Sequence, residues 1–293
     1  MTKHLLFSLL FVCTLGISQN IHQLEPSKNH YTTLKSLSAL PNGKNSDLDK
    51  ISYPSSEYSS GTLIYTMVSP NYLTGEQVEA LKNSIQFPAN SSAQTRAELD
   101  FLLEWQEKRT SEQEHRSKDV LAPIGYWPHI DVLQDHGRYE QNLRHLFYIG
   151  RSILGEDCNA EKYPATAVLL RGITKDMRIM EFTVKYHLLR ARPYHLEPKL
   201  RPLARISSPS FASGHTLWAY IHAFIWSELV PEKRQEFLAK AYEVGESREI
   251  MGIHYPSDEE AARILAHKML TAMWNNTKFK KEYNLAKKEW AQR

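Results

Sequence analysis

Apolar residues recur with helical periodicity through most of the chain after residue 70, and few stretches there alternate as a β-strand would. Thr74 with Gln77 forms a capping box before an apolar stretch, and Ser92 precedes another. The pattern predicts helices over residues 74–84, 92–105, 138–154, 165–190, 216–229, 233–251 and 258–275. The sequence therefore predicts an all-α fold, a helical bundle with long connecting loops.

The first 18 residues have a different character. Lys3 and His4 precede an apolar run over residues 5–15, and Gly16 and Ser18 place small residues at −3 and −1 of a cleavage point. This pattern is typical of a secretory signal peptide, and the run is too short to span a bilayer. Cleavage near Ser18 predicts an exported protein, periplasmic or secreted. A lipoprotein anchor on Cys13 fits less well, because the preceding residue is a bulky valine.

Residues 19–70 are polar, with turn-forming residues near 41–43 and 54–56. We expect a loose, partly disordered N-terminal extension, in which residues 63–68 form a short strand or a buried extended segment. Residues 71–293 then form the main helical domain. Removal of the signal peptide would leave Cys158 as the single cysteine, so no internal disulfide can form.

Composition excludes some classes of protein. With 42% hydrophobic and 24% charged residues, the 293-residue chain is typical of a globular protein. Its formal charge of +3, which falls to +2 without Lys3, is too small for a nucleic-acid-coating protein. After the signal peptide no apolar run reaches membrane-spanning length, which predicts a mature chain without an integral membrane segment.

The candidate chemistry lies in three segments of the last third of the chain. They are Lys185-x6-Arg192-Pro193, Ser213-Gly214-His215 and Arg248-x5-His254-x3-Asp258.

The spacing in the first segment predicts that Lys185 and Arg192 project from one helix face, with Pro193 ending that helix. A helix beginning near Thr216 would point its free amides at Gly214, where they can bind an anion. Gly252 is expected to end the helix that carries Arg248. Ser257 with Glu260 predicts a capping box for the last of the predicted helices.

The same helix start would bring the Asp258 carboxylate near the His254 imidazole. A carboxylate there fixes the imidazole tautomer and leaves the other nitrogen able to attack. Each segment also has a simpler interpretation on its own: a solvated basic face or RNA-contacting patch, an ordinary turn, and a structural His–Asp hydrogen bond.

Taken together, the three segments resemble the phosphatidic acid phosphatase type 2 (PAP2)/haloperoxidase superfamily. They are most similar to the bacterial class A non-specific acid phosphatases, over about residues 165–270. The resemblance implies a PAP2-type helical bundle, with Lys185, Arg192, Ser213, Gly214 and Arg248 binding phosphate. It also implies His254 as the nucleophile, oriented by Asp258, and His215 as the general acid and base. The sequence departs from the pattern at Ala212, where the usual motif has a proline.

These residues predict an acid phosphatase that hydrolyses small phosphate monoesters through a phosphohistidine. Three fixed cations stabilise the charge on the transferring phosphoryl group, so no metal or other cofactor is expected. Other possibilities are a soluble lipid phosphatase or diphosphatase, a vanadate-dependent haloperoxidase, and a non-catalytic anion-binding protein. Homo-oligomerisation is possible, and the physiological substrate stays open.

One other polar cluster has residue types that bind metals. It comprises His129, Asp131, Asp135, His136 and Glu140. His136 and Glu140 lie one helical turn apart and could ligate a metal, but no third ligand follows at helical spacing. A polar segment between helices is the simpler interpretation.

Overall fold

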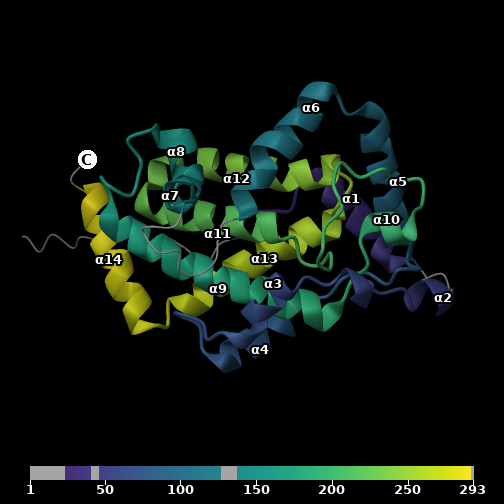
Figure 1. Cartoon of the computed structure of the whole chain (residues 1–293), viewed down its shortest axis with the longest axis horizontal. Coiled ribbons are helices and arrows are strands. Elements are labelled where there is room, and N and C mark those ends of the chain that lie inside the picture. Colours follow the sequence, from purple (N-terminus) through teal and green to yellow (C-terminus); the bar gives the residue numbers. More distant parts are fainter. Residues whose placement is uncertain (1–23, 41–45, 127–136, 292–293) are drawn as a thin grey trace, which may run out of the picture.

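The structure is a computed structural model that describes residues 24–40, 46–126 and 137–291. Within these residues it is a bundle of helices, and the only β-type pairing is an isolated bridge between Ser52 and Arg190 (Figure 1). The predicted all-α fold class is confirmed. The predicted signal peptide and its cleavage point lie outside the described residues.

The N-terminal part of the chain contains mostly short helices. They are α1 (Asn29–Ser36), η1 (Leu37–Ala39), α2 (Ser46–Asp49), η2 (Ser55–Glu57), α3 (Ser60–Leu63), η3 (Ile64–Met67), α4 (Gly75–Lys82), α5 (Ala93–Lys108), α6 (Ser111–His115), the π-helical η4 (Arg116–Leu121) and η5 (Ala122–Tyr126). The remaining helices are α7 (Tyr139–Leu146), α8 (Tyr148–Leu154), α9 (Pro164–Leu188), α10 (Pro193–Leu196), α11 (Gly214–Leu229), η6 (Pro231–Lys233), α12 (Arg234–Ile250), α13 (Pro256–Met273) and α14 (Thr277–Ala291).

Helix α11 forms the centre of the bundle. It packs against α9, α12 and α13, and every one of its residues except His215 is buried (Figure 1). Apolar residues surround this helix on all sides, as a helix in the middle of a core requires. Its first residue is Gly214, so the centre of the core ends at the predicted phosphate-binding turn. The packing of α11 therefore fixes the position of this turn.

A second apolar cluster supports the loop that carries His254. Ile253 and Tyr255 pack with Leu99 and Leu102 of α5, and all four side chains are at most 4% exposed. The buried neighbours on both sides of His254 restrict its backbone. The loop is therefore positioned by a helix that precedes it by about 150 residues in the chain.

Part of the predicted N-terminal extension packs on α9. Tyr53 and Tyr65 are 1% and 2% exposed, and α3 and η3 contact α9. The Tyr53 amide donates to the Leu189 carbonyl at 2.8 Å, directly after α9. Residues 63–68 were predicted to be extended; this was wrong, because they lie at the end of α3 and in η3. The domain boundary at residue 70 stays a prediction.

Most predicted helices occur, with the expected start signals. Thr74 and Gln77 form the capping box of α4, and the Ser92 hydroxyl accepts from the Thr95 amide to cap α5. The helix predicted over residues 138–154 is interrupted at Phe147 and forms α7 and α8. No helix among the described residues is both long and apolar enough to cross a membrane.

Candidate active site

A cavity of about 600 Å³ brings the three predicted segments together. Six of the eight predicted site residues line it: Lys185, Arg192, Gly214, His215, Arg248 and His254. Asp258 lies behind His254 and contacts its imidazole. The Ser213 hydroxyl donates to Thr216 Oγ1 at 3.1 Å and does not line the cavity. The predicted roles of these residues stay predictions, but their convergence is a feature of the fold.

Lys185 and Arg192 are cations that the fold holds with neutral oxygen atoms. Lys185 Nζ donates to the carbonyls of Pro209 and Ser210 at 2.7 and 3.0 Å, and Arg192 donates to the carbonyls of Ser208 and Ile253 at 2.9 Å. Both side chains are 1% exposed, and within the described residues neither forms an ion pair. Burying a charge without a counterion is costly, which marks this place as one suited to an anion.

Burial affects the protonation of both groups. Burial, followed by the nearby charge of Arg192, lowers the pKa of Lys185 to about 7. Burial also lowers the pKa of Arg192. A bound anion would favour the charged form of Lys185 and therefore raise its pKa again.

Arg248 approaches the cavity from the last turn of α12. Its guanidinium donates to the Ser117 carbonyl at 2.9 Å and to the Ser247 hydroxyl at 2.7 Å. Gly252 then ends this region with a φ of +69°, a backbone conformation that favours glycine and that turns the chain toward His254. The sequence correctly predicted that Gly252 would end this helical segment.

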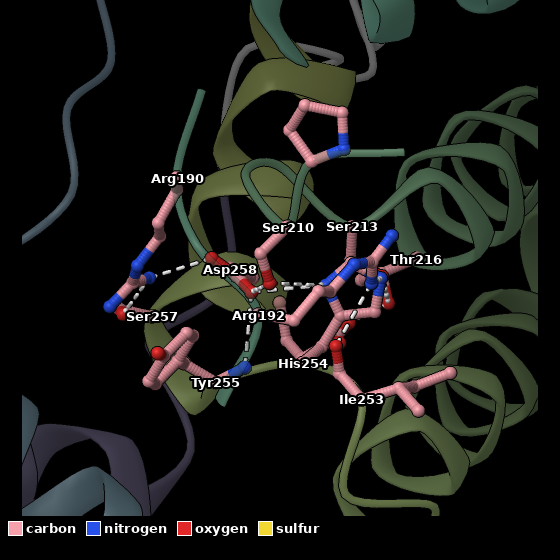
Figure 2. A network of polar contacts seen from close by, with 12 residues as sticks. Arg190, Arg192, Ser210, Ser213, Thr216, Ile253, His254, Tyr255, Ser257 and Asp258 are labelled. Atoms are coloured by element: carbon pink, nitrogen blue, oxygen red, sulfur yellow. Dashed lines mark hydrogen bonds and ion pairs between the residues drawn. The ribbon is translucent and has the colours of Figure 1, made fainter. Parts of the chain in front are cut away.

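His254 and Asp258 form the expected pair (Figure 2). His254 Nδ1 lies 3.0 Å from Asp258 Oδ2, and Nε2 lies 2.9 Å from Arg192 Nη1. Because a guanidinium can only donate, Nε2 must be the acceptor and Nδ1 must carry the proton. Burial, followed by the charge of Arg192, holds the pKa of His254 well below its ordinary value. The imidazole is therefore neutral, with the Nε2 lone pair facing the cavity cations.

Arg190 holds the other side of Asp258. Arg190 Nη1 donates to Asp258 Oδ1 at 2.6 Å, and the guanidinium lies over the Tyr255 ring at 3.8 Å from its centroid (Figure 2). Arg190 also forms an ion pair with Glu98 at 3.4 Å, and all three charged side chains are fully buried. Unlike Arg192, this arginine is therefore neutralised by carboxylates and is a structural cation.

Asp258 is held in its ionised form. Besides Arg190, its carboxylate accepts hydrogen bonds from the Ser210 hydroxyl at 2.5 Å and the Tyr255 amide at 3.0 Å. Burial alone would raise the pKa of Asp258, but the Arg190 charge and the His254 hydrogen bond outweigh burial and lower it. A carboxylate fixed on both oxygens leaves His254 one orientation.

Replacement of Arg190 by methionine should leave the buried Glu98 and Asp258 carboxylates without their cation. We expect a loss of about 3–5 kcal/mol in the free energy of unfolding, the range for a broken buried ion pair. Urea denaturation followed by circular dichroism measures this, with Arg171→Met as the control, because Arg171 is an exposed arginine earlier on α9. A loss no larger than that of the control would contradict the assigned role of Arg190.

His215 faces the cavity from the first turn of α11. Its Nε2 lies 2.8 Å from the Ala122 carbonyl, so this nitrogen carries a proton and donates. Burial, followed by the charge of Arg248, holds the pKa of His215 well below its ordinary value. His215 at the start of α11 and His254 in the loop before α13 thus enter the same cavity from two different segments of the chain.

Gly214 lies directly against the Glu181 carboxylate. A Cβ atom built on Gly214 would lie 2.0 Å from Glu181 Oε1, so a larger residue there would force the carboxylate to move. Glu181 is 6% exposed and accepts from Arg178 Nη1 at 2.6 Å. Glu181 and Arg178 both line the cavity, and sequence patterns did not single them out.

Two local predictions around the site were wrong. Helix α9 ends at Leu188, so Lys185 and Arg192 do not share a helix face; Arg192 is extended before Pro193. The chain after Pro193 instead forms α10. Ser257 does not cap α13, because that helix starts at Pro256 and the Asp258 carboxylate accepts from the Tyr255 amide. The Ser257 hydroxyl donates to Glu98 instead.

Arg190 and Ser210 were missed by the sequence prediction. The sequence did contain a signal for Arg190. Pro193 disfavours a helix in the residue before it, and in an extended segment Arg190 lies on the same side as Arg192. The partnership of Ser210 with Asp258 joins positions 48 residues apart and had no local signal.

No group of three or more metal-ligating side chains gathers within the described ranges. Four members of the alternative metal cluster, His129, Asp131, Asp135 and His136, lie outside them.

Comparison with known proteins agrees with this geometry. A family model described as the PAP2 superfamily matches residues 163–282, the range from α9 into α14 that contains all eight predicted site residues. The predicted resemblance of these residues to the PAP2 superfamily is confirmed. A solved structure, a bacterial vanadium-dependent iodoperoxidase, superposes on 84% of this chain and 64% of that chain with a TM-score of 0.54. At 16% identity this likeness concerns the fold alone.

Curated relatives of this chain are named as phosphatases. A non-specific acid phosphatase of Providencia stuartii is 40% identical over 82 residues, which cover 28% of this chain and 33% of that protein. One of Salmonella typhimurium is 29% identical over 130 residues, which cover 42% of this chain and 50% of that protein. The chain thus spans a third to a half of the length of the relatives it matches.

Proposed function

We propose that this protein is an acid phosphatase that hydrolyses phosphate monoesters through a phosphorylated His254. The single observation that carries the proposal is a neutral imidazole facing buried cations. His254 Nε2 is 2.9 Å from Arg192, while Nδ1 is tied to Asp258 at 3.0 Å. A protein that only binds anions needs the cations but gains nothing from an oriented nucleophile and a second histidine. The names of the relatives support the same activity.

In the first step, the phosphoryl group would lie among Lys185, Arg192 and Arg248. Its oxygens would take the guanidinium N–H that Arg192 now gives to His254, and this frees the Nε2 lone pair. Nε2 attacks phosphorus, the N–P bond forms, and the bond from phosphorus to the leaving oxygen breaks. Protonated His215 gives its proton to that oxygen, so an alcohol leaves.

In the second step, neutral His215 accepts a proton from a water molecule as the water oxygen attacks phosphorus. The P–N bond breaks and returns the electron pair to His254, which is neutral again, and His215 is again protonated. In both transition states negative charge is spread over the phosphoryl oxygens. Arginine N–H groups and Lys185 would stabilise it without rearrangement.

The experiment that tests the activity is an assay of the purified protein on p-nitrophenyl phosphate, a phosphatidate vesicle, and bromide with peroxide. We expect turnover of the aryl phosphate, unaffected by EDTA, and export of the protein to the periplasm or medium. Turnover of phosphatidate alone would indicate a lipid phosphatase. Bromide oxidation dependent on added vanadate would indicate a haloperoxidase.

Anion binding should weaken as pH rises through about 7. The cause is Lys185, whose pKa is lowered to about 7, so that the free enzyme loses this cation above that pH. Sulfate keeps a constant charge over this range and reports the effect as a competitive inhibitor. We expect its inhibition constant to rise by up to about tenfold per pH unit above 7, because one proton must be taken up.

Lys185→Arg is the matched variant, because a guanidinium stays charged throughout. Its inhibition constant should change much less over the same range. An equal pH dependence in both proteins would assign the titration to another group.

A further inference from the structure

Helix α9 presents a stripe of residues to the cavity that extends beyond Lys185. Arg178, Glu181, Phe182 and Lys185 are spaced i, i+3, i+4 and i+7, and all four line the cavity. The phosphoryl group as placed above uses only Lys185 of this stripe. The remaining part carries an arginine that has no role in binding the transferred phosphoryl group.

The Arg178 guanidinium is held in place by three neighbours. Glu181 Oε2 accepts from Nη1 at 2.6 Å, and the rings of Phe182 and Tyr65 lie at 4.7 and 5.2 Å from the guanidinium carbon. A guanidinium has five N–H donors, so one carboxylate oxygen does not exhaust them. Because the group is already ordered, little side-chain entropy is lost when it binds a ligand.

Arg178 lies near His215, the residue proposed to protonate the leaving oxygen. Glu181, which holds Arg178, approaches Gly214 so closely that a Cβ there would be 2.0 Å from Oε1. The next residue is His215, the proposed proton donor to the leaving oxygen. Burial and then the charge of Arg248 are the main causes that lower the pKa of His215. The charge of Arg178 lowers it further, as expected for two groups that lie close together.

The cavity as a whole favours negative charge beyond one phosphoryl group. Among the described residues that line it, Glu181 is the single carboxylate against seven basic side chains. These are Lys118, Arg138, Arg178, Lys185, Arg192, Arg205 and Arg248. Lys118 and Arg205 are exposed, and neither forms an ion pair with a carboxylate within the described ranges. A neutral alcohol as leaving group would leave this excess of charge unused.

We propose that Arg178 binds a second anionic group, carried by the leaving group, and that the preferred substrates are phosphate esters of alcohols that bear a phosphate or carboxylate of their own. This rests on the proposed function. Lys118 and Arg205 at the cavity then attract the same group. Arg178 is a specificity-determining residue, and its contribution depends on the charge of the leaving group.

Three aryl phosphates with different leaving-group charge test this inference. Phenyl phosphate leaves as a neutral phenol, 4-carboxyphenyl phosphate carries a carboxylate, and 4-(aminomethyl)phenyl phosphate carries an ammonium group. We expect kcat/KM to be highest for the carboxylate and lowest for the ammonium ester. The carboxylate should gain about tenfold over phenyl phosphate, which is typical of one charged hydrogen bond.

The variants separate specificity from folding. Arg178→Gln should remove the tenfold preference for the carboxylate ester. Arg178→Gln combined with Glu181→Gln should do the same without an unpaired Glu181. Arg171→Gln is the control, because this exposed arginine lies on the same helix but outside the cavity, and it should keep the preference.

Equal kcat/KM for the three esters in the wild-type protein would overturn the inference while leaving the phosphatase intact. The inference would also be overturned if both Arg178 variants lost activity equally on all three esters. Absence of turnover on all three esters would instead contradict the proposed function, and the inference falls with it.

Discussion

His254→Ala should lower kcat for p-nitrophenyl phosphate by about 10⁴-fold or more, the scale seen when an enzyme loses its nucleophile. The loss follows from geometry: His254 Nε2 points into the cavity toward Arg192, 2.9 Å away, and Nδ1 is occupied by Asp258. The other imidazole that lines the cavity, His215, donates to the Ala122 carbonyl. Steady-state kinetics with purified variants measures the effect.

The same variant should still bind sulfate. Lys185, Arg192 and Arg248 are held by carbonyl and hydroxyl groups, so they stay in place without His254. Equilibrium binding of sulfate should change by less than about tenfold. His187→Ala is the matched control, because His187 is exposed on α9 and outside the cavity, and its kcat should equal that of the wild type. Substantial turnover by His254→Ala would remove this residue from the chemistry.

His215→Ala should have an effect that depends on the leaving group. General acid catalysis contributes about 10²–10⁴-fold when the departing oxygen is basic, and little when it is an activated phenolate. We expect losses of that size on alkyl phosphates and much smaller ones on p-nitrophenyl phosphate. A plot of log kcat/KM against leaving-group pKa should become steeper in the variant than in the wild type.

The lowered pKa of His215 also gives the direction of the pH dependence. Only the protonated imidazole can donate, so activity on alkyl phosphates should rise as pH falls below the ordinary range of histidine. His254, which must be neutral, limits activity at the acidic end, and a bell-shaped profile with an acidic optimum results. Equal losses on alkyl and aryl esters, with no change of slope, would contradict the acid role of His215.

The sequence predicted which residues gather at the site better than it predicted the local backbone there. Charged residues at fixed spacings have few uses, so Lys185, Arg192, Arg248 and His254 could be grouped from their spacing and residue types. Gly252 and the Thr74 cap were also readable, because they act within one turn of the chain.

What the sequence did not predict depends on distant partners. The backbone at Arg190 is extended and forms a β-bridge with Ser52, more than 130 residues earlier. Next to it, the Tyr53 amide donates to the Leu189 carbonyl. Glu98 of α5 contributes to the Asp258 network from a distance of about 160 residues. The Ser257 hydroxyl donates to Glu98 and not to the first turn of its own helix. The predicted capping box of Ser257 and Glu260 was therefore wrong.

Rapid quenching of the protein during turnover of a ³²P-labelled aryl phosphate tests the central proposal most directly. We predict a phosphorylated protein that is stable to alkali and labile to acid, with the label on His254 by mass spectrometry and none in His254→Ala. Turnover at full rate without any labelled protein, or a label on another residue, would contradict a phosphohistidine at His254.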